Sequence, residues 1–255
     1  MANTVFNNKI IEAKANDLLT TAVNTRSLMA VDTSLAEQAG MTKTINVYTY
    51  TGTAEEVAAG AGNSKRGNIT YTGTDYTVKM VQQVFDYQDE DFMKDNTIVD
   101  NGLKLANQAM VNKMTADFVA ECEKATVNHT GAISYDTIVD AIAKLNVEDE
   151  SSLVVIVNAA GKAELRKDPD YVAARMGEVV YNGQVGTIAG IPVVVSKAVT
   201  NAYVLSKDAI RLFLKKDVEV EQERDADTRT NSIYLRSAYV CALTDATKVC
   251  KITKA

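Results

Sequence analysis

Residues 41–85 read MTKTINVYTYTGTAEEVAAGAGNSKRGNITYTGTDYTVKMVQQVF, and this stretch decides the fold. Its two arms, Lys43–Thr51 and Asn68–Phe85, are rich in β-branched and aromatic residues, which favour strands. Apolar and polar side chains alternate along both arms, as in a half-buried strand. The tip between them, Gly52–Gly67, consists mostly of Ala, Gly, Glu, Lys and Arg. The stretch therefore predicts a long, open β-hairpin.

A hairpin of this length has little of its own chain to pack against, and two strands alone are marginally stable in water. We expect it to be buried on another molecule. The charged tip residues Glu55, Glu56, Lys65 and Arg66 are the candidate contact residues. This pattern indicates a subunit of an assembly rather than a self-contained enzyme.

Composition limits the remaining classes of function. The 255 residues are 46% hydrophobic, which suits one large or two small globular domains. The net charge of −6 argues against a DNA-binding surface, because contacts with phosphates need clustered Lys and Arg. No apolar run approaches the roughly 20 residues that cross a bilayer, and the N-terminal sequence lacks the features of a secretion signal. We expect a protein without a membrane partner that is made and kept in the cytoplasm.

The residues that usually build metal or catalytic sites are scarce. Cys122, Cys241 and Cys250 show no CxxC spacing and are expected to be reduced, packed thiols. The one histidine, His129, lies in the connector NHTG and is expected to be solvated near a helix end. A zinc site or a catalytic triad would have to be built around that single imidazole. We therefore expect no catalytic residue, no cofactor and no metal.

Two other motifs have weak functional interpretations. The tip sequence GAGNSKRG lacks the spacing of a phosphate-binding P-loop and is better explained as a mobile loop. Asp168 and Asp170 in the turn DPDY could form a carboxylate pair, but helix capping and turn formation explain them more simply.

After the hairpin the sequence predicts helices. The acidic residues 86–91 suit the positive end of a helix dipole, and a short helix is expected there. Asn96 or Thr97 is expected to cap a longer helix that runs to Ala125. An earlier, weaker helix is predicted over Lys9–Asn24. The apolar stripe of the long helix comprises Val99, Leu103, Ala106, Met110, Met114 and Phe118.

From residue 131 onward, α and β signals alternate, and the last third is almost entirely β. Charged residues 224–229 form a hinge between strands. The predicted elements are a Ser134-capped helix to Asn146, strand Leu153–Val157, an Asn158-capped helix Ala159–Lys167, helix Tyr171–Met176, strand Ile191–Val195 after Gly183, Gly186 and Gly190, and strands Tyr203–Leu205, Arg211–Leu214, Val218–Glu223, Ile233–Leu243 and Lys248–Thr253.

This order of elements resembles the HK97-fold major capsid protein of tailed bacteriophages. The motifs that carry the resemblance are LVVIVNAAGKAELRKDPD (153–170), GQVGTIAGIPVVVS (183–196) and VEVEQERDADTRTNSIYLRSAYVCALTDATKVCKI (218–252). The resemblance implies an α+β fold divided into an N-terminal arm (1–40), an extended loop (41–86), the spine helix of a peripheral domain (87–132), an axial domain (133–202) and peripheral-domain strands (203–255).

The resemblance also implies a mechanical function. Pentamers and hexamers of the chain would tile an icosahedral head that encloses double-stranded DNA without sequence-specific binding. They would assemble in the host bacterial cytoplasm with a portal protein and, in some phages, decoration proteins. Some family members begin with a cleaved scaffolding segment, which is missing before this arm, so a separate scaffolding protein is implied. In some members an extended-loop lysine forms an isopeptide bond with an asparagine; Lys65 lies in that region, but no partner is identified.

Two alternatives remain at this point. An encapsulin-like shell around a protein cargo would share most of these features. A cytoplasmic α/β enzyme would have Asp168, Asp170 and His129 as its best acid and base groups. The enzyme alternative predicts a compact monomer or small oligomer.

Overall fold

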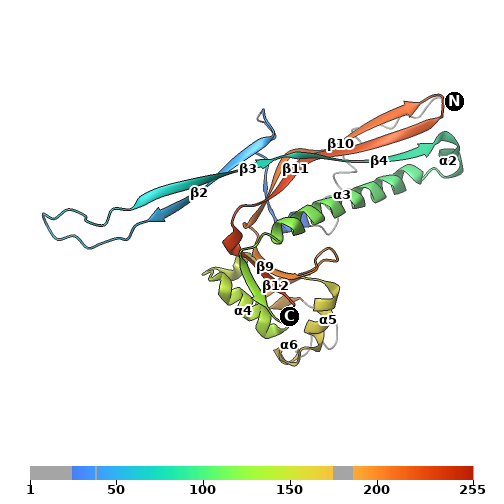
Figure 1. Ribbon diagram of the computed structural model, residues 1–255. Coiled ribbons are helices and arrows are strands. Elements are labelled where there is room, and N and C mark those ends of the chain that lie inside the picture. Colours follow the sequence, from blue (N-terminus) through green and yellow to red (C-terminus); the bar gives the residue numbers. More distant parts are fainter. Residues whose placement is uncertain (1–24, 38, 175–185, 255) are drawn as a thin grey trace.

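The computed structural model describes residues 25–37, 39–174 and 186–254. The chain forms two sheets, a long helix and a projecting hairpin (Figure 1). In chain order the elements are the 3-10 helix η1 (Thr25–Leu28), β1 (Ala30–Asp32), β2 (Thr42–Thr51), β3 (Asn68–Thr77), β4 (Lys79–Gln88), α2 (Asp89–Lys94), α3 (Ile98–Cys122), β5 (Val127–Thr130), α4 (Tyr135–Leu145), η2 (Glu150–Ser152), β6 (Leu153–Val157), α5 (Ala159–Lys167), α6 (Pro169–Ala174), β7 (Thr187–Ile188), β8 (Ile191–Val195), β9 (Ala202–Ser206), β10 (Ile210–Asp225), β11 (Thr230–Leu243), η3 (Ala246–Lys248) and β12 (Val249–Thr253).

Some predictions fall outside the described residues. They are the helix over Lys9–Asn24, most of the N-terminal arm, Gly183 and the last two residues of the helix predicted to end at Met176.

A four-stranded sheet in the order β1-β10-β11-β4 lies along α3 (Figure 1). One of its faces packs on the helix, where Val218, Val220, Ile233 and Leu235 share a buried cluster with the part of the apolar stripe that runs from Val99 to Met110. The whole predicted stripe is buried, so the periodicity was interpreted correctly. Of the two predicted cap residues, Thr97 occupies the N-cap position, but its side chain forms no capping hydrogen bond. The helix ends at Cys122 rather than at the predicted Ala125.

A six-stranded sheet in the order β5-β12-β9-β6-β8-β7 forms the second unit, together with α4, α5 and α6 (Figure 1). All five residues of β6 are buried, as the apolar run predicted. Both predicted caps are confirmed. Ser134 Oγ accepts a hydrogen bond from the Thr137 amide at 3.2 Å, and Asn158 Oδ1 accepts one from the Gly161 amide at 2.7 Å.

The hairpin prediction was right for β2 and β3 and wrong for the end of the second arm. β2 and β3 pair from Thr42 with Thr77 out to Thr51 with Asn68. The chain then passes through buried Val78 into β4, which pairs with β11 in the four-stranded sheet. Only residues 42–77 form the projecting hairpin, because the last part of residues 41–86 finds its partner strand within the same chain.

Two other predictions of local structure need correction. Residues 210–225 form one strand, β10, because two register shifts near Lys216 accommodate the charged residues that suggested a break. The connector NHTG is mostly strand β5, so His129 lies beside Ile252 of β12 and not at a solvated helix end. The strands predicted at Tyr203–Leu205 and Lys248–Thr253 are confirmed as β9 and β12, which pair inside the six-stranded sheet.

Candidate assembly interface on the projecting hairpin

The strand register gives the hairpin two chemically different faces. Directly opposed residues in an antiparallel pair share a face, and successive residues alternate between faces. Tyr48 lies opposite Tyr71, and Tyr50 lies opposite Ile69, so these four side chains share one face. We call this set the aromatic face. The other face, which we call the threonine face, carries Val47, Thr49, Thr70 and Thr72.

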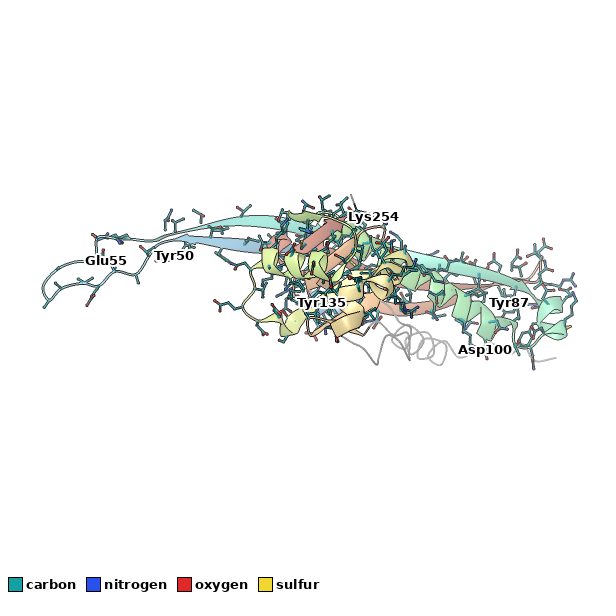
Figure 2. The ribbon with its side chains drawn as sticks, turned by 90° about the horizontal axis from the view of Figure 1, so that it is seen from below. Tyr50, Glu55, Tyr87, Asp100, Tyr135 and Lys254 are labelled. Atoms are coloured by element: carbon teal, nitrogen blue, oxygen red, sulfur yellow. The ribbon has the colours of Figure 1, made fainter. Side chains whose placement is uncertain are left out.

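The aromatic face is exposed. Its four side chains are 63–68% accessible, and the Tyr48 and Tyr71 rings lie 5.9 Å apart between centroids. Figure 2 shows Tyr50 far out on the projecting segment, away from both sheets. Clustered exposed apolar side chains of this size mark interaction surfaces, because burying them removes a large area from water.

Two glycines let the Tyr50 ring lie flat against the backbone at the start of the tip. A Cβ atom at Gly52 or Gly67 would overlap the Tyr50 ring. Gly52 in addition lies against the backbone of Gly67, with 2.7 Å between a built Cβ atom and the Gly67 Cα atom, so this position needs glycine for space.

The predicted tip residues differ in what they do. The Glu55 carboxylate accepts hydrogen bonds from the Ser64 amide, from Ser64 Oγ at 2.8 Å and from the Lys65 amide at 3.3 Å. These bonds, the Ser64 amide foremost, lower the pKa of Glu55. Glu55 thus holds the two sides of the tip together. Glu56, Lys65 and Arg66 are exposed on the same tip.

The base of the hairpin is fixed to the body. The Tyr76 hydroxyl donates to the Leu243 carbonyl oxygen at 2.6 Å, and its ring lies 6.3 Å from that of Phe213. The Val78 amide donates to the Met41 carbonyl oxygen at 2.7 Å. These contacts set the direction of the projection within a single subunit.

A second exposed surface, on which apolar side chains lie beside the hydrogen-bonded pair Gln82 and Arg236, lies on the four-stranded sheet, on the face opposite α3. Met80 and Val84 of β4 are 59% and 38% exposed there. Tyr234 of β11 lies opposite Val84, and Glu221 of β10 lies opposite Tyr234. We call Met80, Val84 and Tyr234 the outer-sheet patch. Sequence reasoning missed it, because β4 was assigned to the hairpin.

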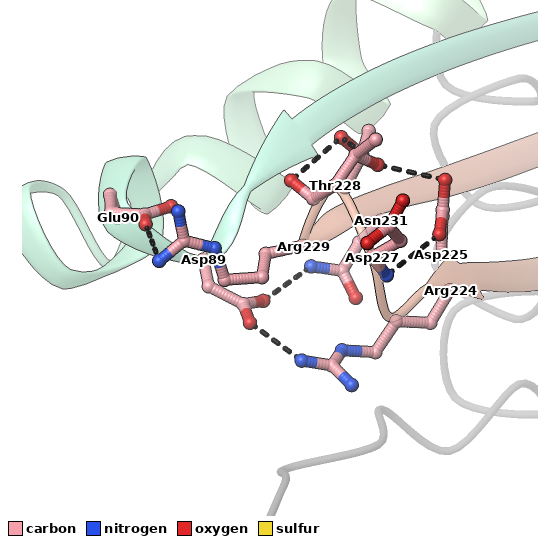
Figure 3. Close-up of polar contacts among 9 residues, drawn as sticks. Asp89, Glu90, Arg224, Asp225, Asp227, Thr228, Arg229 and Asn231 are labelled. Carbon is pink, nitrogen blue, oxygen red and sulfur yellow. Dashed lines mark hydrogen bonds and ion pairs between the residues drawn. The ribbon is translucent and has the colours of Figure 1, made fainter.

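A polar cluster fastens the far end of this sheet to α2 (Figure 3). The Asp89 carboxylate accepts hydrogen bonds from Arg224 Nη2 at 2.8 Å and from Asn231 Nδ2 at 2.7 Å. Arg229 and Glu90 form an ion pair of 2.6 Å. The hydrogen bond from Arg224 is the largest cause of the lowered pKa of Asp89. The turn predicted as a charged hinge is therefore anchored.

One of the candidate acid and base groups of the enzyme alternative, Asp168, has a structural role. Asp168 accepts hydrogen bonds from the amides of Tyr135 and Asp170, as expected for a capping and turn residue. Within the described ranges, no group of three or more His, Cys, Asp or Glu residues could hold a metal ion.

The three cysteines are free and buried, which confirms the prediction of packed thiols. Burial raises the pKa of the Cys241 thiol to about 12 and also raises that of Cys122. These thiols are therefore protonated and poorly reactive at neutral pH. None of the helices in the described part of the chain is long and apolar enough to cross a bilayer.

Comparison with known proteins gives a consistent family. A curated relative, the major capsid protein of Staphylococcus phage phiMR11, is 28% identical over 240 residues, which cover 89% of this chain and 86% of the relative. The capsid structure of cyanophage P-SCSP1u matches with a TM-score of 0.73 at 12% identity over 89% of this chain and 86% of that one. A virus-like particle from Pyrococcus furiosus matches with a TM-score of 0.67 at 9% identity, over 96% and 98% of the two chains.

The structural likeness confirms the predicted α+β fold of the HK97 type. The family model described as phage capsid protein matches residues 70–252, well over half of the chain. The chain therefore belongs to the phage capsid protein family: it is a structural protein of the phage virion whose copies assemble into the capsid shell.

Proposed function

We propose that this protein is the major subunit of an icosahedral phage head that encloses double-stranded DNA, and that the projecting hairpin of each copy lies on a neighbouring copy. The observation that carries the proposal is the exposed aromatic face, which belongs to none of the buried clusters found in the described ranges of the chain. Burying such side chains contributes about 1.5–3 kcal/mol each, before the costs of association. Repeated in every subunit, such contacts would hold a shell together.

The exposed tip residues Glu56, Lys65 and Arg66 are proposed to contact the neighbour as well. Their charges would mainly set the register of the contact, because exposed ion pairs add little stability. Glu55 is proposed to act indirectly, by keeping the tip closed through its bonds to residues 64 and 65.

The two sheets are proposed to belong to two domains with different roles in the shell. The six-stranded unit, which comprises 127–206 and β12, is the proposed axial domain that meets its copies at the centres of pentamers and hexamers. The four-stranded sheet with α2 and α3 is the proposed peripheral domain that forms the wall. These limits replace the predicted boundary at residue 202, because β9 and β12 pair with β6 and β5.

Further partners are proposed from the family. A separate scaffolding protein, a portal protein and, in some phages, decoration proteins would join the shell during assembly in the host cytoplasm. The net charge of −6 supports a shell wall that does not bind the packed DNA tightly, since the negative charges of the protein and of the DNA repel each other.

The likeness to the Pyrococcus particle supports a second candidate, a shell around a protein cargo. The contents of purified particles separate the two candidates. Nuclease-protected DNA supports the phage head, and a co-purifying protein in the absence of nucleic acid supports the cargo shell.

The proposal is tested on the purified full chain by sedimentation velocity and negative-stain electron microscopy. We expect rings, sheets or closed shells. A monodisperse monomer at high protein concentration, with the hairpin folded against its own body, would contradict the proposal.

A further inference from the structure

We infer that β4 pairs in antiparallel orientation with β4 of a second copy of this chain, so that the four-stranded sheets of two subunits join into one continuous sheet. The pairing rests on the proposed function, since it joins copies of the chain in a shell. It adds a contact between copies that does not involve the projecting hairpin.

The outer edge of β4 is open. β4 lies at the end of the sheet order β1-β10-β11-β4. Its ten residues pair with β11 without interruption, from Lys79 opposite Tyr239 to Gln88 opposite Thr230. In an antiparallel edge strand, every second residue points its amide and carbonyl groups away from the sheet. Among the described residues, no further strand pairs with these groups, so the edge can accept a strand from another subunit.

β4 also lacks the features that usually protect an edge strand, which are short length, several charges, proline or a bulge. The edge strands β1, β5 and β7 have three, four and two residues. In β5, the Asn128 carbonyl oxygen also accepts a hydrogen bond from Lys144 Nζ at 3.1 Å. β4 has ten residues, no proline or glycine and no register shift against β11, and its only charged residues are Lys79 and Asp86. An edge of this kind favours pairing between copies.

The side chains of β4 favour one register, with Gln82 at the centre of the pair. Met80 then lies opposite Val84 of the partner subunit, and the same contact is repeated on the other side of the centre. Met80 and Val84 are 59% and 38% exposed on the face away from α3, and bringing them together removes apolar surface from water. A centre at Gln83 would instead place Met80 opposite Asp86 of the partner subunit, which leaves a carboxylate beside an apolar side chain.

The symmetry of this contact suits a shell wall. A strand that pairs with its own copy uses the same surface on both subunits, and the two copies are related by a twofold axis. The axis passes through the sheet at right angles, because opposed residues of an antiparallel pair share a face. Both copies of α3 therefore lie on the same side of the joined sheet, and the wall keeps one inner and one outer face. In the proposed icosahedral shell, twofold axes relate neighbouring pentamers and hexamers, so β4 would join one ring to the next.

A single cysteine tests the pairing, because one position can be linked between two copies only where it meets its own equivalent. Gln82→Cys lies at the proposed axis, where directly opposed Cβ atoms are about 4.5–5.5 Å apart. The matched control is Gln83→Cys. Its equivalents would be diagonal neighbours about 7–8 Å apart between Cα atoms, which is too far for a disulfide.

Assembled shells are oxidised with copper–phenanthroline and analysed on a non-reducing denaturing gel. We expect dimers from Gln82→Cys. We expect monomers from Gln83→Cys and from the wild type, whose native cysteines are buried. Dimers from Gln83→Cys alone, from both variants or from neither would overturn the proposed pairing.

A measurement on the wild type covers the case in which Gln82→Cys does not assemble. Amide hydrogen exchange of β4 is compared between unassembled subunits and shells. We expect the fast-exchanging amides of β4 to slow by roughly tenfold or more in the shell. Shells in which β4 exchanges as fast as in the free subunit would overturn the pairing and leave the proposed function standing. A wild type that forms no shells would contradict both.

Discussion

At the end of α3, the Glu123 carboxylate joins the helix to the six-stranded sheet. It accepts a hydrogen bond from Asn201 Nδ2 at 3.0 Å and another from the Tyr203 hydroxyl, and it forms an ion pair with Lys251. Partial burial opposes ionisation, but the bonds donated by Lys251, Tyr203 and Asn201 outweigh it and lower the pKa of Glu123. The ionised form therefore stabilises the folded subunit at neutral pH.

We predict that Glu123→Gln lowers the free energy of unfolding by about 1 kcal/mol at pH 7. The Glu123 side chain is 37% exposed, which keeps the effect modest. Because the folded-state pKa lies below the unfolded one, the wild type loses this contribution as the pH falls through the folded-state pKa. The two stabilities should converge once the pH lies below the lowered pKa of Glu123. Urea unfolding of unassembled subunits at pH 7 and at acidic pH measures this.

The matched control is Glu56→Gln on the hairpin tip, which should leave the stability of the subunit unchanged at both pH values. If the Glu123→Gln difference stayed constant down to acidic pH, the charge of the carboxylate would not be its cause.

Replacing Gly102 of α3 by alanine has two opposing effects on the stability of the subunit. Alanine is the better helix former by about 1 kcal/mol. A Cβ atom at this position, however, would lie 2.5 Å from Cε2 and 2.8 Å from Cδ2 of Phe85, whose ring packs on the cluster between the helix and β4. Overpacking of this kind costs typically 1–3 kcal/mol.

We predict that Gly102→Ala destabilises the subunit by about 1 kcal/mol net, although it improves helix propensity. Thermal or urea unfolding measures the change. Lys104→Ala, at an exposed position of the same helix, should change stability by less than about 0.5 kcal/mol. A stabilised Gly102→Ala variant would show that the Phe85 ring moves aside freely.

Within the described part of the chain, the projecting hairpin is joined to the two sheets through its base. Only its base packs on the body, through Ile45, Tyr76 and Val78. The strands beyond Asn46 and its partner Gly73 pair only with each other. Folding of the two sheets should therefore not depend on the outer hairpin.

We predict that replacing residues 47–72 by Asn-Gly leaves a folded subunit that no longer assembles. The two-residue turn suits the opposed pair Asn46 and Gly73, and Asn-Gly favours the type I′ turn that closes a hairpin. Circular dichroism melting should match the wild type, and electron microscopy should show no shells. Shell formation by this variant would refute the role of the hairpin; unfolding of the variant would instead show that the body needs the outer strands.

Sequence alone predicted the elements whose signals are local. Ser134 and Asn158 correctly predicted the start of their helices, and the apolar run 153–157 correctly predicted a buried strand. The misassigned segments depend on distant partners. Tyr76, Val78 and Met80 continue one alternation, and nothing local shows that pairing changes from β2 to β11 within it.

Prediction of the candidate contact surface was limited in the same way, because the surface depends on which strands pair and in which register. The charges of the tip were evident in the sequence, whereas the aromatic face was not. Tyr48, Tyr50 and Tyr71 share a face only in the observed register, and a shift by one residue would place Tyr71 among the threonines. The contact role of Glu55 stays a prediction, and the sequence did not show that its hydrogen-bond partners within the subunit lie across the tip, at residues 64 and 65.

At the scale of the whole molecule, one buried cluster spans both sheets. Phe118 and Cys122 at the end of α3 pack with Ile156 and Tyr203 of the six-stranded sheet, and the same cluster contains Leu212 of the four-stranded sheet. A capsid wall must transmit force between its domains. A shared core makes the two sheets one cooperative unit rather than two independently folding parts.

We predict that Phe118→Leu, at a fully buried position, destabilises both sheets together by about 1–1.5 kcal/mol. Amide hydrogen exchange of unassembled subunits should then accelerate about equally in β6 and β9 and in β10 and β11. The comparison variant is Ile233→Val. Ile233 lies in the cluster between α3 and the four-stranded sheet, and this substitution lowers the free energy of unfolding by about 0.5–1.5 kcal/mol. If unfolding is fully cooperative, that variant should also accelerate exchange in the slowest amides of the six-stranded sheet. Acceleration confined to one sheet in either variant would show that the two units open separately and that the shared cluster does not couple them.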